Sequence, residues 1–307
     1  MSQRFTDEHI DAWNRDGAVL IPNFFTAEEL APVVKDFELL YGERRVRSRT
    51  AHTEDREIGG GFNFDQFRNI DDMPFDCSPA LNLLGLHPAL IDLARSALET
   101  DDVRLYQSHS WAKHTGETNY DQPFHCDYKN HTLTVPSDEK GLRTINIMIY
   151  VTEVTDDLGA IHYVPQPESN PITGEHRTMF LDGDPKAQEQ LKAIERSGAG
   201  PAGSIFAYGI DVYHRGTNLT APEGFRYTLT SSYKAAGNDM IGWSAWPYAF
   251  MKPWHLLFDN ATPDQLACLG VPRPGDPFWT PRTIARSQER WPNWDMTAYK
   301  AAISVPA

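Results

Sequence analysis

Residues 144–152 have the sequence TINIMIYVT, in which aliphatic residues occupy every second position. Successive side chains of a β-strand point to opposite faces, so this alternation predicts a strand with one face in the hydrophobic core. The aliphatic face would carry Ile145, Ile147, Ile149 and Val151, and the opposite face Asn146, Met148 and Tyr150. The second face is therefore available for polar contacts.

Shorter strand-like stretches lie on either side of this segment. They cover residues 103–113, 160–164, 204–208 and 227–233, and Gly, Pro or Asp residues bound them. Several short strands at this spacing predict a β-sandwich or barrel. The predicted fold class is therefore mainly β with flanking helices.

The predicted flanking helices lie mostly within residues 1–100. A helix over residues 7–15 would end at Gly17, and Thr26 with Glu29 forms a capping box that starts a second helix, which reaches about residue 41. An apolar strand over residues 18–25 separates the two, and residues 78–98 again look helical. The first third of the chain is thus predicted to be a mostly helical flank.

Two further regions have a different composition. Residues 43–75 contain four arginines close together and a triple glycine, which favours a surface loop or lid. Residues 240–307 are rich in Trp and Pro, and only residues 262–269 look helical there. The aromatic residues of this C-terminal extension suit packing or contacts in a homodimer. No linker separates these regions, so we expect a single domain over residues 1–307.

The composition excludes several classes of protein. The chain of 307 residues has 28 Lys and Arg against 42 Asp and Glu, a formal net charge of −14, which leaves no electrostatic footprint for nucleic acid or an anionic membrane. No stretch approaches the roughly 18 to 20 apolar residues of a membrane span, and no signal peptide is recognisable. The three scattered cysteines fit a reducing compartment. We expect a cytoplasmic protein whose partner is a small-molecule substrate, with no nucleic acid and no membrane.

A His-x-Asp pair, His125 and Asp127, marks a candidate metal site. On an extended chain both side chains would point to the same face and could take adjacent positions on one metal ion. A third ligand must come from a distant segment, and the histidines downstream are His131, His162, His176, His214 and His255. His214 is the best placed, because it follows a predicted strand in a polar, turn-like stretch. The resulting two-His, one-carboxylate triad suits Fe(II) and leaves three coordination positions open.

Open positions on the metal allow a bidentate 2-oxo acid and O₂ to bind together. The far carboxylate of such an acid needs a cation at a fixed distance, and Arg is a bidentate partner that is always charged. Arg226 lies 12 residues after His214 at the start of a predicted strand, and a hairpin-like return would bring it beside the metal. Arg215 is the rival, but sequence neighbours on an extended chain point to opposite faces.

Four segments together resemble the phytanoyl-CoA dioxygenase (PhyH-like) family of Fe(II)/2-oxoglutarate-dependent oxygenases. They are WNRDGAVLIPNFFTAEEL at 13–30, the His125-Cys-Asp127 motif, EVTDDLGAIHYVP at 153–165, and the stretch from Gly203 through His214-Arg-Gly-Thr-Asn to Arg226. The resemblance covers about residues 12 to 234. It implies a double-stranded β-helix, the cupin-like jelly roll, with Fe(II) as metal, 2-oxoglutarate as cosubstrate and O₂ as oxidant.

The resemblance also implies which reaction and which further residues to expect. It implies hydroxylation, or another oxidation, of an unactivated C–H bond in a secondary-metabolite, acyl or amino-acid type of substrate, with release of succinate and CO₂. The strand at 103–113 would face the site, so that Gln107 or Lys113 could contact cosubstrate or substrate, and Asn146 would lie near 2-oxoglutarate. The family's Ser two residues after the distal His is missing, and Thr217 is the predicted substitute.

Three other functions remain open at this stage. Related halogenases have Gly or Ala where this chain has Asp127, so halogenation is a minor alternative. A cupin-like isomerase could use the same three ligands for another metal without 2-oxoglutarate. A non-catalytic jelly-roll binding protein would hold no metal.

Overall fold

The computed structural model describes residues 4–42, 69–116, 121–132, 135–137, 139–174, 184–241 and 252–303. Its centre is a sheet of six antiparallel strands in the order β1-β7-β4-β9-β3-β2, accompanied by a three-stranded sheet in the order β6-β5-β8. The large sheet comprises β1 (Ala18–Ile21), β2 (Ile70–Asp72), β3 (Val103–His114), β4 (Thr144–Tyr150), β7 (Ile205–Tyr208) and β9 (Phe225–Ala235). The small sheet comprises β5 (His162–Val164), β6 (Arg196–Ser197) and β8 (Tyr213–Arg215). The described strands form two separate sheets and no closed barrel.

Strand β4 divides the interior as its alternation predicts. Ile145, Ile147 and Ile149 are buried in the largest hydrophobic cluster, together with residues of the helical flank. Tyr150 belongs to a second cluster that includes Phe206 and residues around β5 and β8, on the other side of the large sheet. We call this second side the inner face of the sheet, because it faces the small sheet.

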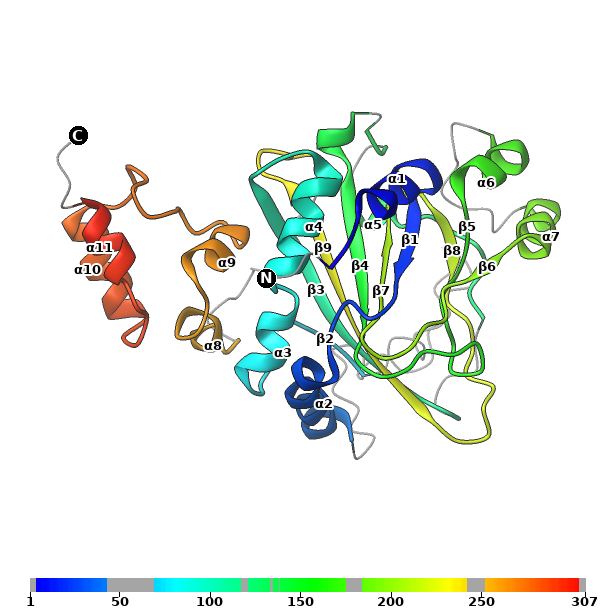
Figure 1. The fold of residues 1–307 in the computed structure, drawn as a ribbon, viewed down its shortest axis with the longest axis horizontal. Coiled ribbons are helices and arrows are strands. Elements are labelled where there is room, and N and C mark those ends of the chain that lie inside the picture. The colour runs from blue at the N-terminus through cyan, green and yellow to red at the C-terminus, as the bar shows by residue number, and fades with distance from the viewer. Residues whose placement is uncertain are drawn as a thin grey trace.

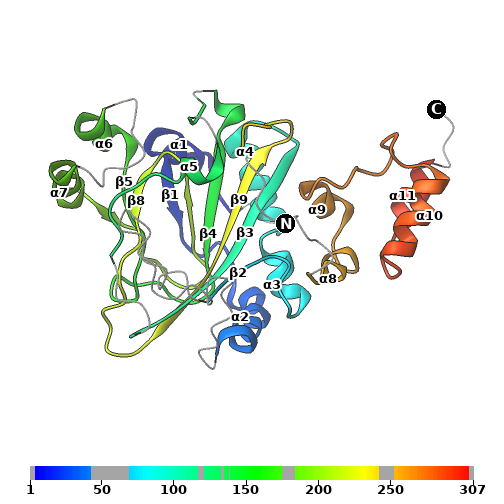
Figure 2. The same cartoon turned by 180° about the vertical axis from the view of Figure 1, so that it is seen from behind.

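Helices cover the outer face of the large sheet. They are α1 (Asp7–Asp16), α2 (Ala27–Tyr41), α3 (Pro79–Leu84) and α4 (Pro88–Leu98) in the N-terminal third. Figures 1 and 2, drawn from opposite sides, show α1 and α4 on one side of the large sheet. The capping box predicted for α2 is present, since the Thr26 hydroxyl accepts from Glu29 N and the Glu29 carboxylate accepts from Thr26 N. The α-helices between the strands are α5 (Tyr128–His131), α6 (Gln166–Thr173) and α7 (Pro185–Ala193), with a 3-10 turn η2 over Lys140–Leu142.

The C-terminal extension contains more helix than its sequence predicts. Besides α9 (Pro263–Cys268), it forms α8 (His255–Phe258), α10 (Pro281–Arg290) and α11 (Thr297–Ile303). Helix α10 buries only Ile284, so it has no apolar periodicity to detect, and its start is set by a capping box between Thr280 and Thr283. Both views show α10 and α11 at the end of the molecule away from the small sheet, beyond α8 and α9 (Figures 1 and 2).

Three other expectations need correction. The strand predicted over 18–25 ends at Ile21, because Pro22 has no N–H for a sheet hydrogen bond. The helix predicted over 78–98 is two helices, since Pro88 disfavours helical geometry at His87, which caps α4 instead. Part of the predicted 43–75 loop is strand β2, and residues 43–68, with the arginine cluster and the triple glycine, lie outside the described residues.

One continuous hydrophobic cluster includes residues of β4, of α2 to α4 and of the C-terminal helices as far as Tyr299. This continuity supports our proposal that the chain is a single domain. None of the helices in the described ranges is long and apolar enough to span a membrane.

Candidate metal centre

Two distant segments are hydrogen-bonded together at the candidate metal site. His125 lies before α5 and His214 lies in the middle of β8, and the two residues form an isolated antiparallel bridge. His125 N donates to His214 O and His214 N donates to His125 O, each at 3.0 Å. Residues that exchange both bonds lie directly opposite each other with their side chains on one face. The imidazole centroids are accordingly 4.6 Å apart.

Side chains on both sides fix this bridge. The side-chain Oε1 of Gln122 accepts from Gly216 N at 2.7 Å, and the backbone N of Gln122 donates to Gly216 O at 2.9 Å. Gln188 from α7 pairs with both backbone groups of Phe124, at 2.9 and 3.0 Å. The loop that carries His125 is therefore attached to both β8 and α7.

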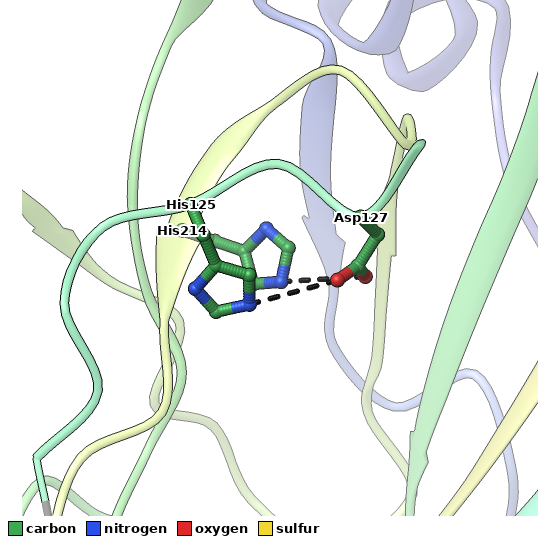
Figure 3. A group of neighbouring side chains, drawn as sticks. All are labelled: His125, Asp127 and His214. Atoms are coloured by element: carbon green, nitrogen blue, oxygen red, sulfur yellow. Dashed lines mark ion pairs between the residues drawn. The ribbon is translucent and has the colours of Figure 1, made fainter. Parts of the chain in front are cut away.

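The backbone conformation of Asp127 differs from the extended one that the sequence predicts. It is not extended but has helical dihedrals (φ −81°, ψ −11°) at the N-cap of α5. The turn into α5 still places its carboxylate in front of both imidazoles (Figure 3). Asp127 Oδ1 lies 3.6 Å from His125 Nε2, and Oδ2 lies 3.4 Å from His214 Nε2.

Both histidines are held in the same tautomer. His125 Nδ1 lies 2.9 Å from Pro123 O, and His214 Nδ1 lies 2.9 Å from Val212 O. A carbonyl oxygen only accepts, so each Nδ1 carries a hydrogen, and each Nε2, on the side of Asp127, is the atom that can bind a proton or a metal ion. The three ligand atoms lie within 4.8 Å of one another, and within the described ranges this is the one group of three or more His, Cys, Asp and Glu with such spacing.

The charges at the site favour an ionised carboxylate. Burial would raise the pKa of Asp127, but His214 and then His125 hold it well below its usual range. Burial lowers the pKa of His214, whereas the Asp127 charge and its hydrogen bond raise it, and the net direction is upward. A carboxylate between two imidazole lone pairs is a donor set that fits a divalent cation such as Fe(II) and leaves coordination positions open.

Two buried cations lie side by side on the inner face of the large sheet. Lys113 on β3 pairs directly with Arg226 on β9 in the sheet register, and both residues are buried. Burial and the neighbouring guanidinium lower the pKa of Lys113 to about 7, and burial lowers the pKa of Arg226 to about 10. Within the described part of the chain neither forms an ion pair with a carboxylate, and Arg226 Nε is buried without a hydrogen-bond partner.

Two buried cations that form no ion pair with a described carboxylate are costly, and the Asp121 charge offsets only part of this cost at Lys113, so the arrangement indicates a place for an anion. The guanidinium of Arg226 donates from Nη1 to the Thr228 hydroxyl at 3.3 Å. This hydroxyl is neutral and does not balance the charge. The rival Arg215 is engaged elsewhere, because Glu195 accepts from its Nε and Nη2 at 2.7 and 2.9 Å.

The other predicted contacts lie on the inner face or near it. Asn146 and Gln107 lie on either side of Ser232 in one row across β4, β9 and β3. Asn146 Oδ1 accepts from the Tyr106 hydroxyl at 3.3 Å. The Thr217 hydroxyl donates to Ala160 O at 2.7 Å, so a contact between this hydroxyl and the cosubstrate requires that bond to break. These roles remain predictions.

Several residues beside the site cannot be found from the sequence pattern. The Tyr106 hydroxyl hydrogen-bonds His131 Nδ1 at 2.6 Å, and the Tyr208 ring centroid lies 4.9 Å from that of His214. His109 contacts Asp72 from the neighbouring strand β2. Their positions depend on strand register and on a β-bulge in β3, neither of which periodicity reveals.

A family model described as phytanoyl-CoA dioxygenase (PhyH) matches residues 13–225 of the chain. No curated protein matches the sequence. The fold is similar to the non-heme alpha-ketoglutarate-dependent carbocyclase SnoK from nogalamycin biosynthesis, with 17% identity over 76% of this chain and 85% of that one and a TM-score of 0.55. It is also similar to EctD from S. alaskensis with 2-oxoglutarate and 5-hydroxyectoine, with 18% identity over 83% and 84% of the chains and a TM-score of 0.56. AviO1 from Streptomyces viridochromogenes Tue57 is 16% identical over 77% of this chain and 98% of its own, with a TM-score of 0.53. These likenesses confirm the predicted jelly-roll fold class.

Proposed function

The chain belongs to the phytanoyl-CoA dioxygenase (PhyH) family, and from that premise we propose that it oxidises an unactivated C–H bond of a small molecule. Its class is that of the Fe(II)/2-oxoglutarate-dependent oxygenases. The single observation that carries the proposal is the convergence of His125 Nε2, His214 Nε2 and the Asp127 carboxylate within 4.8 Å. Three protein ligands on one face of an octahedral ion leave room for a bidentate cosubstrate and O₂.

We assign the ligands and the cosubstrate contacts as follows. His125, Asp127 and His214 would hold Fe(II), and Arg226 with its neighbour Lys113 would receive the far carboxylate of 2-oxoglutarate. Arg226 Nε is buried without a hydrogen-bond partner, and no described carboxylate forms an ion pair with Lys113 or Arg226. A dianionic ligand would accept the hydrogen bond and balance the charge, which supports this assignment. Asn146, Gln107 and Thr217 are the remaining predicted cosubstrate contacts.

The chain's own contribution is to orient ligands and exclude water. Fe(II) with 2-oxoglutarate supplies the oxidising chemistry, in which the cosubstrate becomes succinate and CO₂. The Pro123 and Val212 carbonyls keep both imidazoles in the tautomer that binds a metal. The Tyr208 ring packs beside the His214 imidazole, whose side chain is 6% exposed, so this ligand is largely shielded from water.

The substrate belongs to a small-molecule class, and a secondary metabolite, an acyl compound or an amino acid fits the proposal. Hydroxylation is the favoured outcome. Halogenation is disfavoured because the Asp127 carboxylate occupies the third ligand position in front of both imidazoles.

The test is anaerobic addition of Fe(II) and then 2-oxoglutarate to the purified chain. We expect a weak visible charge-transfer band that saturates with both components, and His214→Ala should abolish it. A wild-type protein that binds neither iron nor 2-oxoglutarate contradicts the proposal. Iron binding without any effect of 2-oxoglutarate would favour the cupin-like isomerase, in which Arg226→Ala leaves activity intact.

A further inference from the structure

A β-bulge in β3 turns Tyr106 toward the segment that carries two of the proposed metal ligands. The strand register skips Tyr106, because its two neighbours on β3 pair with consecutive residues of β9. The buried ring packs in one cluster with Phe124 and Cys126, the residues on either side of His125. Bulges commonly redirect a side chain next to a functional site, and this one takes Tyr106 out of the regular alternation of its strand.

Helix α5, which starts after Asp127, needs support from outside. It is a single turn of four residues, and a turn this short is not stable by itself. An Asp at the N-cap normally accepts a hydrogen bond from the backbone of the first turn. The Asp127 carboxylate makes no such bond and lies instead toward His125 and His214. The orientation of this carboxylate therefore depends on the contacts that hold α5.

Backbone contacts anchor the two ends of α5. Tyr128 N donates to Ile210 O at 3.0 Å, and Thr132, directly after the helix, forms an isolated bridge with Ile241. These contacts fix where the chain enters and leaves the turn. The remaining support comes from a side chain of the turn itself.

His131, the last residue of α5, is held by the Tyr106 hydroxyl. This hydroxyl hydrogen-bonds His131 Nδ1 at 2.6 Å, and the two buried rings meet edge to face with their centroids 5.5 Å apart. Asp127 has helical dihedrals and lies four residues before His131, so both side chains lie on one face of the turn. Burial lowers the pKa of His131, and the Asp127 charge opposes this shift, as expected for neighbours.

We propose that Tyr106 and His131 are positioning residues for Asp127. Their hydrogen bond holds α5 in the orientation that places the carboxylate in front of the two imidazoles. His131, one of the histidines that the sequence offers as a third ligand, would thus act on the metal centre through Asp127. The inference rests on the proposed function and adds to it a residue of the β3 bulge that touches neither metal nor cosubstrate.

The first experiment measures the dissociation constant of Fe(II) by anaerobic equilibrium dialysis. Loss of an outer partner of a metal site lowers affinity by about 10- to 100-fold, so Tyr106→Phe should lose about tenfold or more. Tyr41→Phe is the matched control, because the Tyr41 hydroxyl also forms a buried hydrogen bond of 2.6 Å, to Ser110. The control should stay within about threefold of wild type. An equally small change in Tyr106→Phe overturns the proposal.

Variants of His131 test the same contact from the other side. His131→Leu should lose as much affinity as Tyr106→Phe, whereas His131→Asn keeps a polar atom near the position of Nδ1 and should retain most of it. Two residues that act through one contact are not additive, so the double variant of Tyr106→Phe and His131→Leu should lose no more than either single one. Additive losses overturn the proposal.

The last experiment asks whether the pair acts through Asp127. Tyr106→Phe is made in the wild type and in Asp127→Ala, and both pairs are measured with Zn(II), which N ligands bind more tightly than Fe(II). Without the carboxylate, Tyr106→Phe should change affinity by less than about threefold. An equal loss in both backgrounds overturns the proposal. A wild type that binds no metal overturns the proposed function and this inference together, whereas normal binding by the variants overturns the inference alone.

Discussion

His125 and His214 exchange both backbone hydrogen bonds, each at 3.0 Å, so the positions of the two imidazoles depend on one another. The candidate metal centre therefore depends on the pairing of β8 with the segment before α5 as well as on three side chains. Residues that hold this contact should affect metal affinity without touching the ion.

Gln122→Ala tests this dependence. The substitution removes the acceptor for Gly216 N and loosens the segment that carries His125. Loss of an outer partner of a metal site typically lowers affinity by about 10- to 100-fold, and we expect a loss of that order for Fe(II), measured by equilibrium dialysis. Gln288→Ala in α10 is the control, because the Gln288 side chain also hydrogen-bonds the backbone, by donating to the carbonyls of Trp291 and Pro292, and it should leave Fe(II) affinity unchanged.

Arg226→Met should weaken the binding of 2-oxoglutarate but not the binding of Fe(II). The substitution removes one of two buried cations and leaves the ligand triad untouched. A lost charged hydrogen bond of about 1.5–3 kcal/mol corresponds to a loss of about 10- to 100-fold in affinity. The dissociation constants of Fe(II) and of 2-oxoglutarate are measured separately. Equal losses of both would mean that the variant disturbs the fold rather than the anion site.

Lys113 should make 2-oxoglutarate binding weaken with rising pH. Burial and Arg226 lower the pKa of Lys113 to about 7, so the ammonium is progressively lost above that pH. We expect the affinity for 2-oxoglutarate to fall between about pH 7 and 9, and Lys113→Met to bind more weakly with a flatter profile. An equal slope in wild type and variant would assign the pH dependence to another group.

The same residue predicts a trend in stability of the metal-free protein. The pKa of Lys113 falls from its ordinary value of 10.5 to about 7 in the folded protein, so above pH 7 the unfolded chain binds more protons than the native one. The free energy of unfolding therefore gains a positive contribution as pH rises from about 7 toward 10, and this contribution is absent below about pH 7. Urea denaturation at about pH 7 and pH 9 should show that Lys113→Met lacks this contribution.

Asp36→Ala should destabilise the helical flank without affecting the site. The Asp36 carboxylate on α2 accepts from Ser78 N, the Ser78 hydroxyl and Leu81 N at 3.1, 2.7 and 3.0 Å, which ties α2 to the start of α3. Because these donors would lose their acceptor, we expect the free energy of unfolding to fall by about 1–3 kcal/mol. Denaturant unfolding gives the loss, and an unchanged Fe(II) affinity in the folded variant would show that the flank does not position the metal ligands.

Much of the architecture follows from local patterns. The alternation at β4 and the Thr26–Glu29 capping box each have a local physical cause, and both are present in the structure. The structure also brings His125, Asp127 and His214 together, although Asp127 is helical rather than extended and His214 comes from a distant strand. A short turn can place i and i+2 side chains on one side by a route that strand geometry does not describe.

The contacts that the sequence did not predict depend on pairing between distant strands. That Asp72 lies opposite His109, or Lys113 opposite Arg226, is set by strand register, which one sequence does not encode locally. Helix α10 escapes prediction because it buries one apolar residue and is stabilised by its cap and by contacts of the following aromatics. Conversely, Thr217 is the predicted substitute for the missing Ser of the motif, but its hydroxyl donates to Ala160 O.

The bridge between His125 and His214 also has a consequence for biosynthesis. During translation, His125 and Asp127 leave the ribosome almost ninety residues before His214 does, and until β8 pairs with the earlier loop only two ligands exist. A nascent chain thus has no complete site with which to retain iron. With the proposed ligands, metal capture must follow folding of β8, and a truncated product that stops before residue 214 would lack one of the three ligands.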